Sequence, residues 1–221
     1  MVTAKQASPL GGKLLIVIGI VIVLALALFF YRSQSAQNPS RAPSQDLLIR
    51  EDSPTVGSQS AQVILVEFVD YQCPACAYMH PAVKQLLSDN QGKLRLVVRY
   101  WPLENQHKNA KTAAEAAEAA SEQGKFWEMH DLLLSRQKDW EESETAIDIF
   151  VRYAQELNLN VERFRESIQN NKFEAKIKRD VEDAEALNIS GIPQFFVNGN
   201  SVGYMENLDE FKSKVESYIT K

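Results

Sequence analysis

The apolar residues of this 221-residue chain fall into three kinds of pattern. Residues 14–31 form one uninterrupted apolar run. Two shorter runs, at residues 63–69 and 94–100, are rich in β-branched side chains and predict buried strands. Across residues 109–187, apolar residues recur at helical spacing, which predicts a block of helices.

The C-terminal part of the chain returns to strand patterns. Residues 195–197 predict a third strand, and the pair Asn198 and Gly199 is typical of a tight hairpin turn. Residues 201–204 would form the return strand of that hairpin, and residues 208–219 predict a closing helix. We therefore expect an α/β fold in which a helical block separates the first two strands from a C-terminal hairpin.

The apolar run at residues 14–31 is long enough to cross a bilayer, because a helix of this length spans about 27 Å. Residues 33–36 could serve as a signal-peptide cleavage site, but the length of the run and Arg32 at its end favour an uncleaved anchor. We therefore expect a transmembrane helix here. Basic residues are nearly balanced on its two sides, so the positive-inside rule does not fix its orientation.

A linker and one folded domain are expected after this helix. Residues 32–46 are mostly Ser, Gln, Asn, Pro and Ala, a composition typical of a flexible tether. Residues 47–221 suffice for one globular domain, on which we expect the apolar residues 47–49 to dock. Pro54 and Gly57 indicate a turn before the first strand.

Composition and charge exclude some classes of function. The formal net charge is −5, which offers no basic face for nucleic acid. The chain has two cysteines, too few to staple a domain of this size, so we expect a chemical role for them. We expect a monomer without a cofactor.

Cys73, Pro74, Ala75 and Cys76 form a CxxC motif where the first predicted strand leads into a predicted helix. Two thiols at this spacing can close a small disulfide, and the positive end of the helix dipole lowers the pKa of a thiol placed there. Cys73, at the start of the helix, is the candidate nucleophile, and Cys76 would resolve a mixed disulfide. The alternative is an inert structural disulfide or a pair of buried thiols.

Several motifs together resemble those of the DsbA family of disulfide oxidoreductases. They are residues 66–76 (VEFVDYQCPAC), residues 101–103 followed by His107, residues 124–130 (GKFWEMH) and residues 191–199 (GIPQFFVNG). CxxC alone is a weak signal, whereas CxxC combined with Gly-x-Pro before a paired strand is specific. The resemblance implies a thioredoxin fold with an inserted helical domain at about residues 107–187. The anchored form with a short linker resembles the membrane-tethered bacterial members of the family.

The resemblance also implies roles for residues around the dithiol. Pro193 matches a proline that is cis and lies against the dithiol, which would expose the backbone of Ile192 for strand-like pairing with a substrate chain. A plain proline at the start of a strand is the alternative. Pro74 and Ala75 would tune the thiols; because Ala75 has no basic group, we expect a less extreme oxidant than relatives with histidine there.

Glu67 matches an acidic residue that lies under the dithiol in the family. Strand alternation places it on the face opposite Val66 and Phe68. A partly buried carboxylate there would have a raised pKa and could shuttle a proton for Cys76. The alternative is a solvated carboxylate at a sheet edge.

The histidines indicate no metal site. His80 lies one turn after Cys76, but a closed zinc site needs a fourth ligand at suitable spacing, which is missing. We expect His80 on a helix surface or in a groove. The sequence gives no role to His107 or His130.

Taken together, these patterns favour an extracytoplasmic enzyme that donates the Cys73–Cys76 disulfide to secreted proteins. An oxidising dithiol belongs outside the cytosol, which would place residues 1–13 in the cytoplasm and the domain beyond a bacterial cell membrane. The expected partners are secreted proteins with thiols and, from the resemblance, a quinone-coupled membrane oxidase. A disulfide reductase or isomerase, and a tethered peptide-binding or chaperone module, are the alternatives.

Overall fold

The computed structural model describes residues 22, 26, 27 and 45–220. The chain separates into two units, Met1–Ala42 and Pro43–Lys221, and the fold below is that of the second. The expected N-terminus, and nearly all of the expected transmembrane helix and linker, lie outside the described residues, so these three remain predictions. Within the described part of the chain, no helix has both the length and the apolar character needed to cross a membrane.

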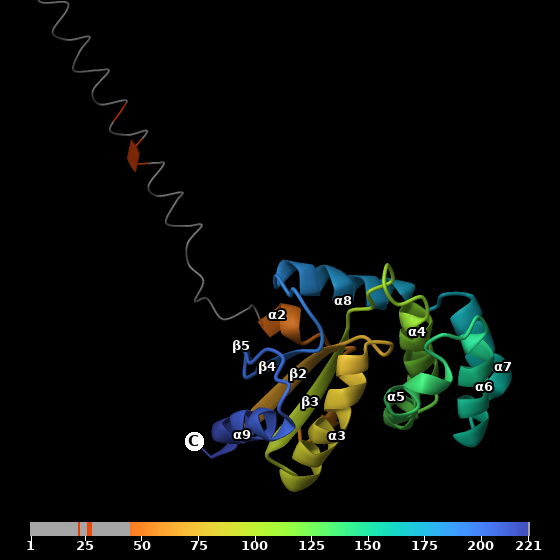
Figure 1. The fold of residues 1–221 in the computed structure, drawn as a ribbon, viewed down its shortest axis with the longest axis horizontal. Coiled ribbons are helices and arrows are strands. Elements are labelled where there is room, and N and C mark those ends of the chain that lie inside the picture. The colour runs from red at the N-terminus through yellow and green to blue at the C-terminus, as the bar shows by residue number, and fades with distance from the viewer. Residues whose placement is uncertain (1–21, 23–25, 28–44, 221) are drawn as a thin grey trace, which may run out of the picture. The chain divides into compact units, whose positions relative to one another are not determined.

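A twisted sheet forms the centre of the second unit (Figure 1). Its strands lie in the order β1–β3–β2–β4–β5; β2 and β3 run parallel, and the other neighbours are antiparallel. The strands are β1 (Thr55–Gly57), β2 (Val63–Val69), β3 (Leu94–Tyr100), β4 (Gln194–Val197) and β5 (Asn200–Ser201). Both long predicted strands are confirmed, whereas the return strand of the hairpin ends earlier than expected.

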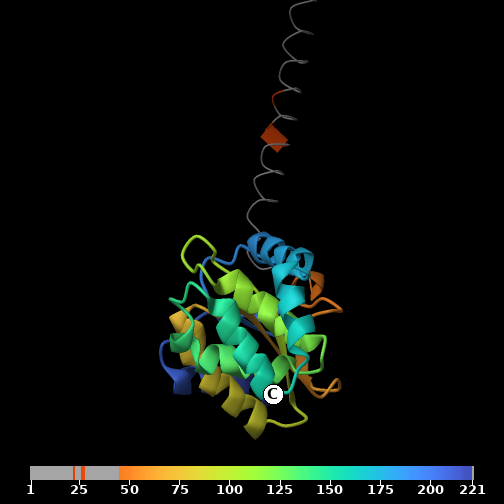
Figure 2. The ribbon, with the colours of Figure 1, turned by 90° about the vertical axis from the view of Figure 1, so that its right-hand side faces the viewer.

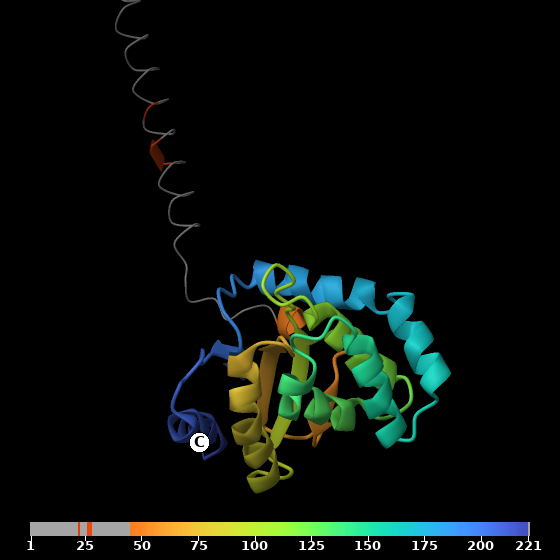
Figure 3. The same ribbon diagram turned by 45° about the vertical axis from the view of Figure 1, so that its right-hand side comes forward.

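Helices cover both faces of the sheet and form a block beyond it (Figures 1 and 3). α3 and α9 pack together on one face, while α8 contacts β3 and α2 on the other. α4 to α7 pack mainly against one another, and Figure 2 shows this block from the side that faces right in Figure 1. The helices are α2 (Gln45–Leu48), α3 (Pro74–Asp89), α4 (Ala110–Ser121), α5 (Phe126–Ser135), the 3-10 helix η1 (Gln137–Asp139), α6 (Ala146–Glu156), α7 (Val161–Gln169), α8 (Glu174–Ala186) and α9 (Leu208–Ile219).

This order of elements is the predicted thioredoxin fold with a helical insert. Five α-helices, α4 to α8, lie between β3 and β4 in the described part of the chain. The α/β class and the thioredoxin fold are therefore confirmed, while the expected membrane helix before them stays untested. The apolar residues at 47–49 dock as expected, because Leu48 is buried in a cluster with residues of β2 and α8.

The turn expected at Pro54 and Gly57 is instead the edge strand β1. It pairs with β3, and Val56 lies opposite Leu96. Gly57 has a φ of 103°, and a Cβ there would overlap the carbonyl oxygen of Leu94. Glycine thus allows β1 to end tightly against β3. A strand of three residues is too short for its alternation to show in the sequence.

β2 is buried on both faces, and its two faces meet different surroundings. Leu65 and Val69 join the main core, which includes α3, whereas Val66 and Phe68 join the cluster on the α8 side. Because side chains alternate along a strand, Glu67 faces the same side as Leu65 and Val69. The sheet therefore directs this carboxylate towards the helix that carries the dithiol.

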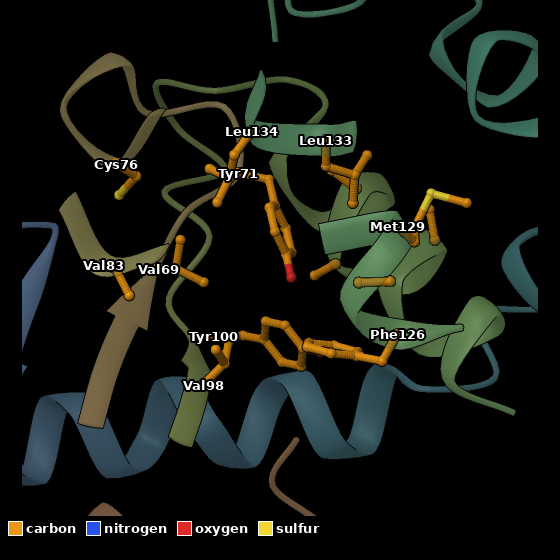
Figure 4. Close-up of a cluster of buried hydrophobic side chains, with 14 of the residues drawn as sticks. Val69, Tyr71, Cys76, Val83, Val98, Tyr100, Phe126, Met129, Leu133 and Leu134 are labelled. Carbon is orange, nitrogen blue, oxygen red and sulfur yellow. The ribbon is translucent and has the colours of Figure 1, made fainter. Parts of the chain in front are cut away.

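Large side chains join the sheet to the helical block (Figure 4). Tyr71, two residues after β2, and Tyr100, at the end of β3, have ring centroids 6.3 Å apart. Figure 4 shows both rings beside Phe126 and Met129 of α5, with Cys76 on the opposite side of Tyr71. This packing fixes the loop that leads into the dithiol helix.

Candidate active site

Cys73 is the residue that precedes α3, and Pro74 begins the helix. The backbone of Cys73 is extended, with φ −73° and ψ 122°, as is usual for the residue that precedes the first turn of a helix. Proline suits the first helical position because the N–H that it lacks would have no partner in the helix. Both cysteines are free; Cys73 is 8% exposed, and Cys76 is fully buried one turn further along.

The two thiols have opposite acidities. Hydrogen bonds lower the pKa of Cys73 to about 6; the largest comes from the Cys76 thiol, and the backbone N–H groups of Cys76 and Ala75 add to it, against the effect of burial. Burial raises the pKa of Cys76 well above its usual range, and its interaction with Cys73 raises it further. At neutral pH the pair therefore holds a thiolate at Cys73 and a proton at Cys76.

Glu67 lies in the central strand of the sheet and is 1% exposed. Its Oε1 atom is buried without a hydrogen-bond partner. Burial raises the pKa of this carboxyl to about 8, so it is mostly protonated at neutral pH. The alternative of a solvated carboxylate at a sheet edge is wrong. Its negative charge, when present, raises the pKa of Cys76, which shows that the two groups are close enough to interact.

The loop before β4 lies against the dithiol. The Ile192–Pro193 peptide bond is cis, and Pro193 is buried. The Cys73 Sγ atom lies 3.9 Å from the carbonyl oxygen of Ile192, towards which the thiol can donate. Pro74 is exposed, and Ala75 and Ile192 are half-buried, so an incoming chain could meet these residues beside Cys73.

Asp70 organises the turn between β2 and α3, and sequence reasoning missed it. Its Oδ1 accepts a hydrogen bond from the Gln72 N–H at 2.7 Å. Its Oδ2 accepts from the Leu103 N–H at 2.8 Å and lies 2.7 Å from Nδ1 of His107. Asp70 is 1% exposed, and its charge opposes the lowering of the Cys73 pKa. His107 thus has a structural partner at the dithiol loop, which the sequence alone did not indicate.

Two glutamines join the dithiol loop to the helical block, and neither was predicted. Gln72 donates from Nε2 to the Glu141 carbonyl at 2.7 Å and accepts from the Asn109 N–H at 2.7 Å. Gln137, from η1, donates to two carbonyl groups of the loop, those of Tyr71 and Cys73. A single glutamine gives no periodic signal, so only the structure could show these contacts.

His80 is buried rather than on a helix surface, which corrects one half of the sequence prediction, but it lines a small pocket between α3 and α5, in keeping with the predicted groove position. α5 packs against α3, and the His80 Nε2 atom lies 3.1 Å from Oδ1 of Asp131. His130, also buried, bonds through Nδ1 with the Tyr71 hydroxyl at 2.9 Å, and burial lowers its pKa to about 3. Among the described residues, no group of three or more His, Cys, Asp or Glu side chains could hold a metal ion.

A family model described as Thioredoxin matches residues 50–217. The chain belongs to the thioredoxin family. Among solved structures, a thioredoxin-like oxidoreductase from Silicibacter pomeroyi has a TM-score of 0.67 and 27% identity, over 80% of this chain and 99% of that one. The thiol-disulfide exchange protein alpha-DsbA2 from Wolbachia pipientis has a TM-score of 0.67 and 24% identity, over 78% of this chain and 90% of that one. The predicted DsbA-like thioredoxin fold is confirmed, and the structures that this chain resembles include a thioredoxin-like oxidoreductase and a thiol-disulfide exchange protein.

Curated relatives match this chain over part of their own length. The Na(+)/H(+) antiporter NhaA 3 from Salinispora tropica is 42% identical over 161 residues, which cover 73% of this chain and 24% of that protein. This thioredoxin-family chain therefore spans about a quarter of the length of the first curated relatives that it matches.

Proposed function

We propose that this chain is an extracytoplasmic thiol–disulfide oxidoreductase that donates the Cys73–Cys76 disulfide to secreted proteins. The observation that carries the proposal is the opposite acidity of the two thiols: hydrogen bonds lower the pKa of Cys73 to about 6, and burial raises that of Cys76. Stabilising the Cys73 thiolate favours the dithiol form, and this makes the disulfide form an oxidant.

Oxidation of a substrate takes two exchange steps. A substrate thiolate attacks Cys73 Sγ, the Cys73–Cys76 bond breaks, and a mixed disulfide forms. The departing Cys76 sulfur needs a proton because its pKa is high, and Glu67, with a pKa of about 8, is protonated at neutral pH and supplies it. A second substrate thiolate then attacks the substrate sulfur, and Cys73 leaves as its stable thiolate. The substrate gains a disulfide, and the enzyme keeps two reduced sulfurs.

Two groups recognise the substrate in this proposal. The backbone of Ile192 beside Pro193 pairs with the substrate segment that carries the attacking cysteine, because its carbonyl oxygen lies next to Cys73 Sγ. Pro74 and Ala75, both accessible, form the other side of the contact. The position of these residues around one sulfur supports a protein chain as the substrate.

The proposal includes the membrane. Residues 14–31 would anchor the domain on the outer side, with residues 1–13 in the cytoplasm, because an oxidising dithiol needs a compartment in which disulfides persist. A quinone-coupled membrane oxidase would return the dithiol to its disulfide form. The apolar run and the oxidising chemistry are the support for this placement.

The reduction potential of the Cys73/Cys76 couple tests the direction of transfer. Equilibration with reduced and oxidised glutathione, followed by thiol alkylation, gives the potential directly. A potential well above that of thioredoxin, about −270 mV, supports disulfide donation. A thioredoxin-like value would instead support a reductase, and a protein without a reversible couple would support a tethered peptide-binding module.

A further inference from the structure

Gln137 connects the helical block to the backbone of the dithiol loop. It begins η1, and the residue is 3% exposed. The Nε2 atom donates to the Tyr71 carbonyl at 2.7 Å and to the Cys73 carbonyl at 3.0 Å. A primary amide has two donor hydrogens, so both are used on the loop that leads into α3.

The Cys73 carbonyl matters because it also begins α3. It accepts the first helical hydrogen bond, from the Ala77 N–H at 3.2 Å, and a carbonyl oxygen can accept a second one. The hydrogen bond from Gln137 therefore takes part in fixing the Cys73 backbone, which decides where Sγ lies relative to the N–H groups of Ala75 and Cys76.

Gln137 is itself held firmly. Its carbonyl accepts hydrogen bonds from the Trp140 N–H at 3.1 Å and the Glu141 N–H at 2.9 Å. Trp140 is fully buried, and its Nε1 donates to the Leu133 carbonyl at 3.1 Å. The loop is thus tied to a rigid part of the helical block rather than to a mobile surface side chain.

We propose that Gln137 is a positioning residue which, from the helical block, holds the Cys73 backbone so that the thiolate keeps its hydrogen bonds and the dithiol keeps its redox equilibrium. Gln137 touches carbonyl groups and not sulfur, so it acts through Cys73. The inference rests on the proposed function and deepens it, because it gives the helical insert a part in setting the strength of the oxidant.

The test replaces Gln137 with methionine, which has similar size and no hydrogen-bond donor. The matched control is Gln123→Met in the same block. Gln123 donates to the Asn160 carbonyl at 3.3 Å and accepts from the Asn160 N–H at 2.8 Å, so these hydrogen bonds do not involve the dithiol loop. Thiolate absorbance against pH and the equilibrium with glutathione are measured for both variants and the wild type, together with Tm.

In Gln137→Met we expect the pKa of Cys73 to rise by about half a unit or more. The glutathione equilibrium should shift about threefold towards the protein disulfide, which corresponds to about 15 mV. Gln123→Met should alter Tm alone. A Gln137→Met protein with a lower Tm but wild-type titration and equilibrium would show a purely structural role and overturn the proposal.

A second variant answers the same question if Gln137→Met does not fold. Gln137→Ala removes both donors without adding a charge and leaves space that water can fill, so it should also raise the pKa of Cys73; a wild-type titration there would overturn the proposal. A wild-type protein that is not an oxidant would contradict the proposed function alone, since the thiolate titrations would still decide whether Gln137 positions Cys73.

Discussion

Replacing Glu67 with glutamine should make the free energy of unfolding less sensitive to pH. Glu67 is 1% exposed, and its Oε1 atom has no hydrogen-bond partner. Burial raises the pKa of the carboxyl from its usual 4.5 to about 8, so between these values the folded protein keeps a proton that the unfolded chain has released. Stability falls with rising pH wherever the folded state binds more protons, and the wild type must lose stability across this window.

The size of the effect follows from the two pKa values of Glu67. The contribution of the carboxyl is fully present below pH 4.5 and is lost as the pH rises through the folded-state pKa of about 8. A difference of about 3.5 pH units, at about 1.36 kcal/mol for each, corresponds to up to about 5 kcal/mol. Glutamine has the same shape and does not titrate. The Glu67→Gln protein should therefore gain stability relative to the wild type as the pH rises from about 5 to 8.

Urea unfolding of the dithiol form across this pH range measures the prediction. The cysteines titrate in both proteins, so the difference between wild type and variant isolates Glu67. Glu128→Gln is the control: Glu128 is exposed and its pKa is lowered by Lys125, so its effect should not change across the range. Parallel pH dependence in wild type and Glu67→Gln would refute the reasoning, because it would mean that the Glu67 carboxyl titrates as a solvated group.

Three further predictions test the nucleophile, the edge strand and the anchor. Cys76→Ser should accumulate mixed disulfides with cellular proteins, seen as adducts that a reductant releases, and Cys73→Ser should not; equal behaviour would contradict the assignment of the nucleophile. Gly57→Ala should lower the free energy of unfolding by about 1–3 kcal/mol more than Gly92→Ala, because both have positive φ but only at Gly57 would a Cβ meet backbone atoms. Equal losses in thermal unfolding would show that the Leu94 carbonyl simply moves aside. The full chain should resist carbonate extraction from membranes, and the chain starting at residue 47 should not; a mature N-terminus near Gln37 would reveal a cleaved signal instead.

The features that the sequence predicted well are those with a strong local signal. β2 and β3 are runs of seven residues, buried on both faces, and such runs carry their apolar character in consecutive positions. The start of α3 at the CxxC motif also has a local cause, because Pro74 suits the first position of a helix. That Ile192 would lie beside Cys73 had no such local signal, and only the combination of motifs in the family resemblance predicted it.

The features that the sequence did not predict depend on partners distant along the chain. Arg99 lies in a predicted strand yet is fully buried, because it donates to Asp180 at 2.7 Å and Asp183 at 2.6 Å, both on α8. His80 was expected on a helix surface or in a groove, and the periodicity of α3 could not decide between the two because it does not reveal that α5 packs against this side of the helix. No sequence pattern indicated a role for Gln137, because that role depends on its hydrogen bonds to the carbonyl groups of Tyr71 and Cys73, more than 60 residues earlier in the chain.

The two faces of the sheet treat buried charge differently, and the difference points to the site of chemistry. On the α8 face, Arg99 is compensated by the two carboxylates of Asp180 and Asp183, an arrangement that a folded structure needs in order to bury charge at all. On the α3 face, Glu67 has no cation and no hydrogen-bond partner for Oε1, so it remains protonated at a cost in stability at higher pH. A carboxyl that is protonated at neutral pH, and whose charge would raise the pKa of the Cys76 thiol, is poorly suited to holding a fold together and well suited to transferring a proton. β2, which carries Glu67, thus packs against an apolar core on both faces, and its uncompensated acid lies on the face that is turned to the dithiol helix.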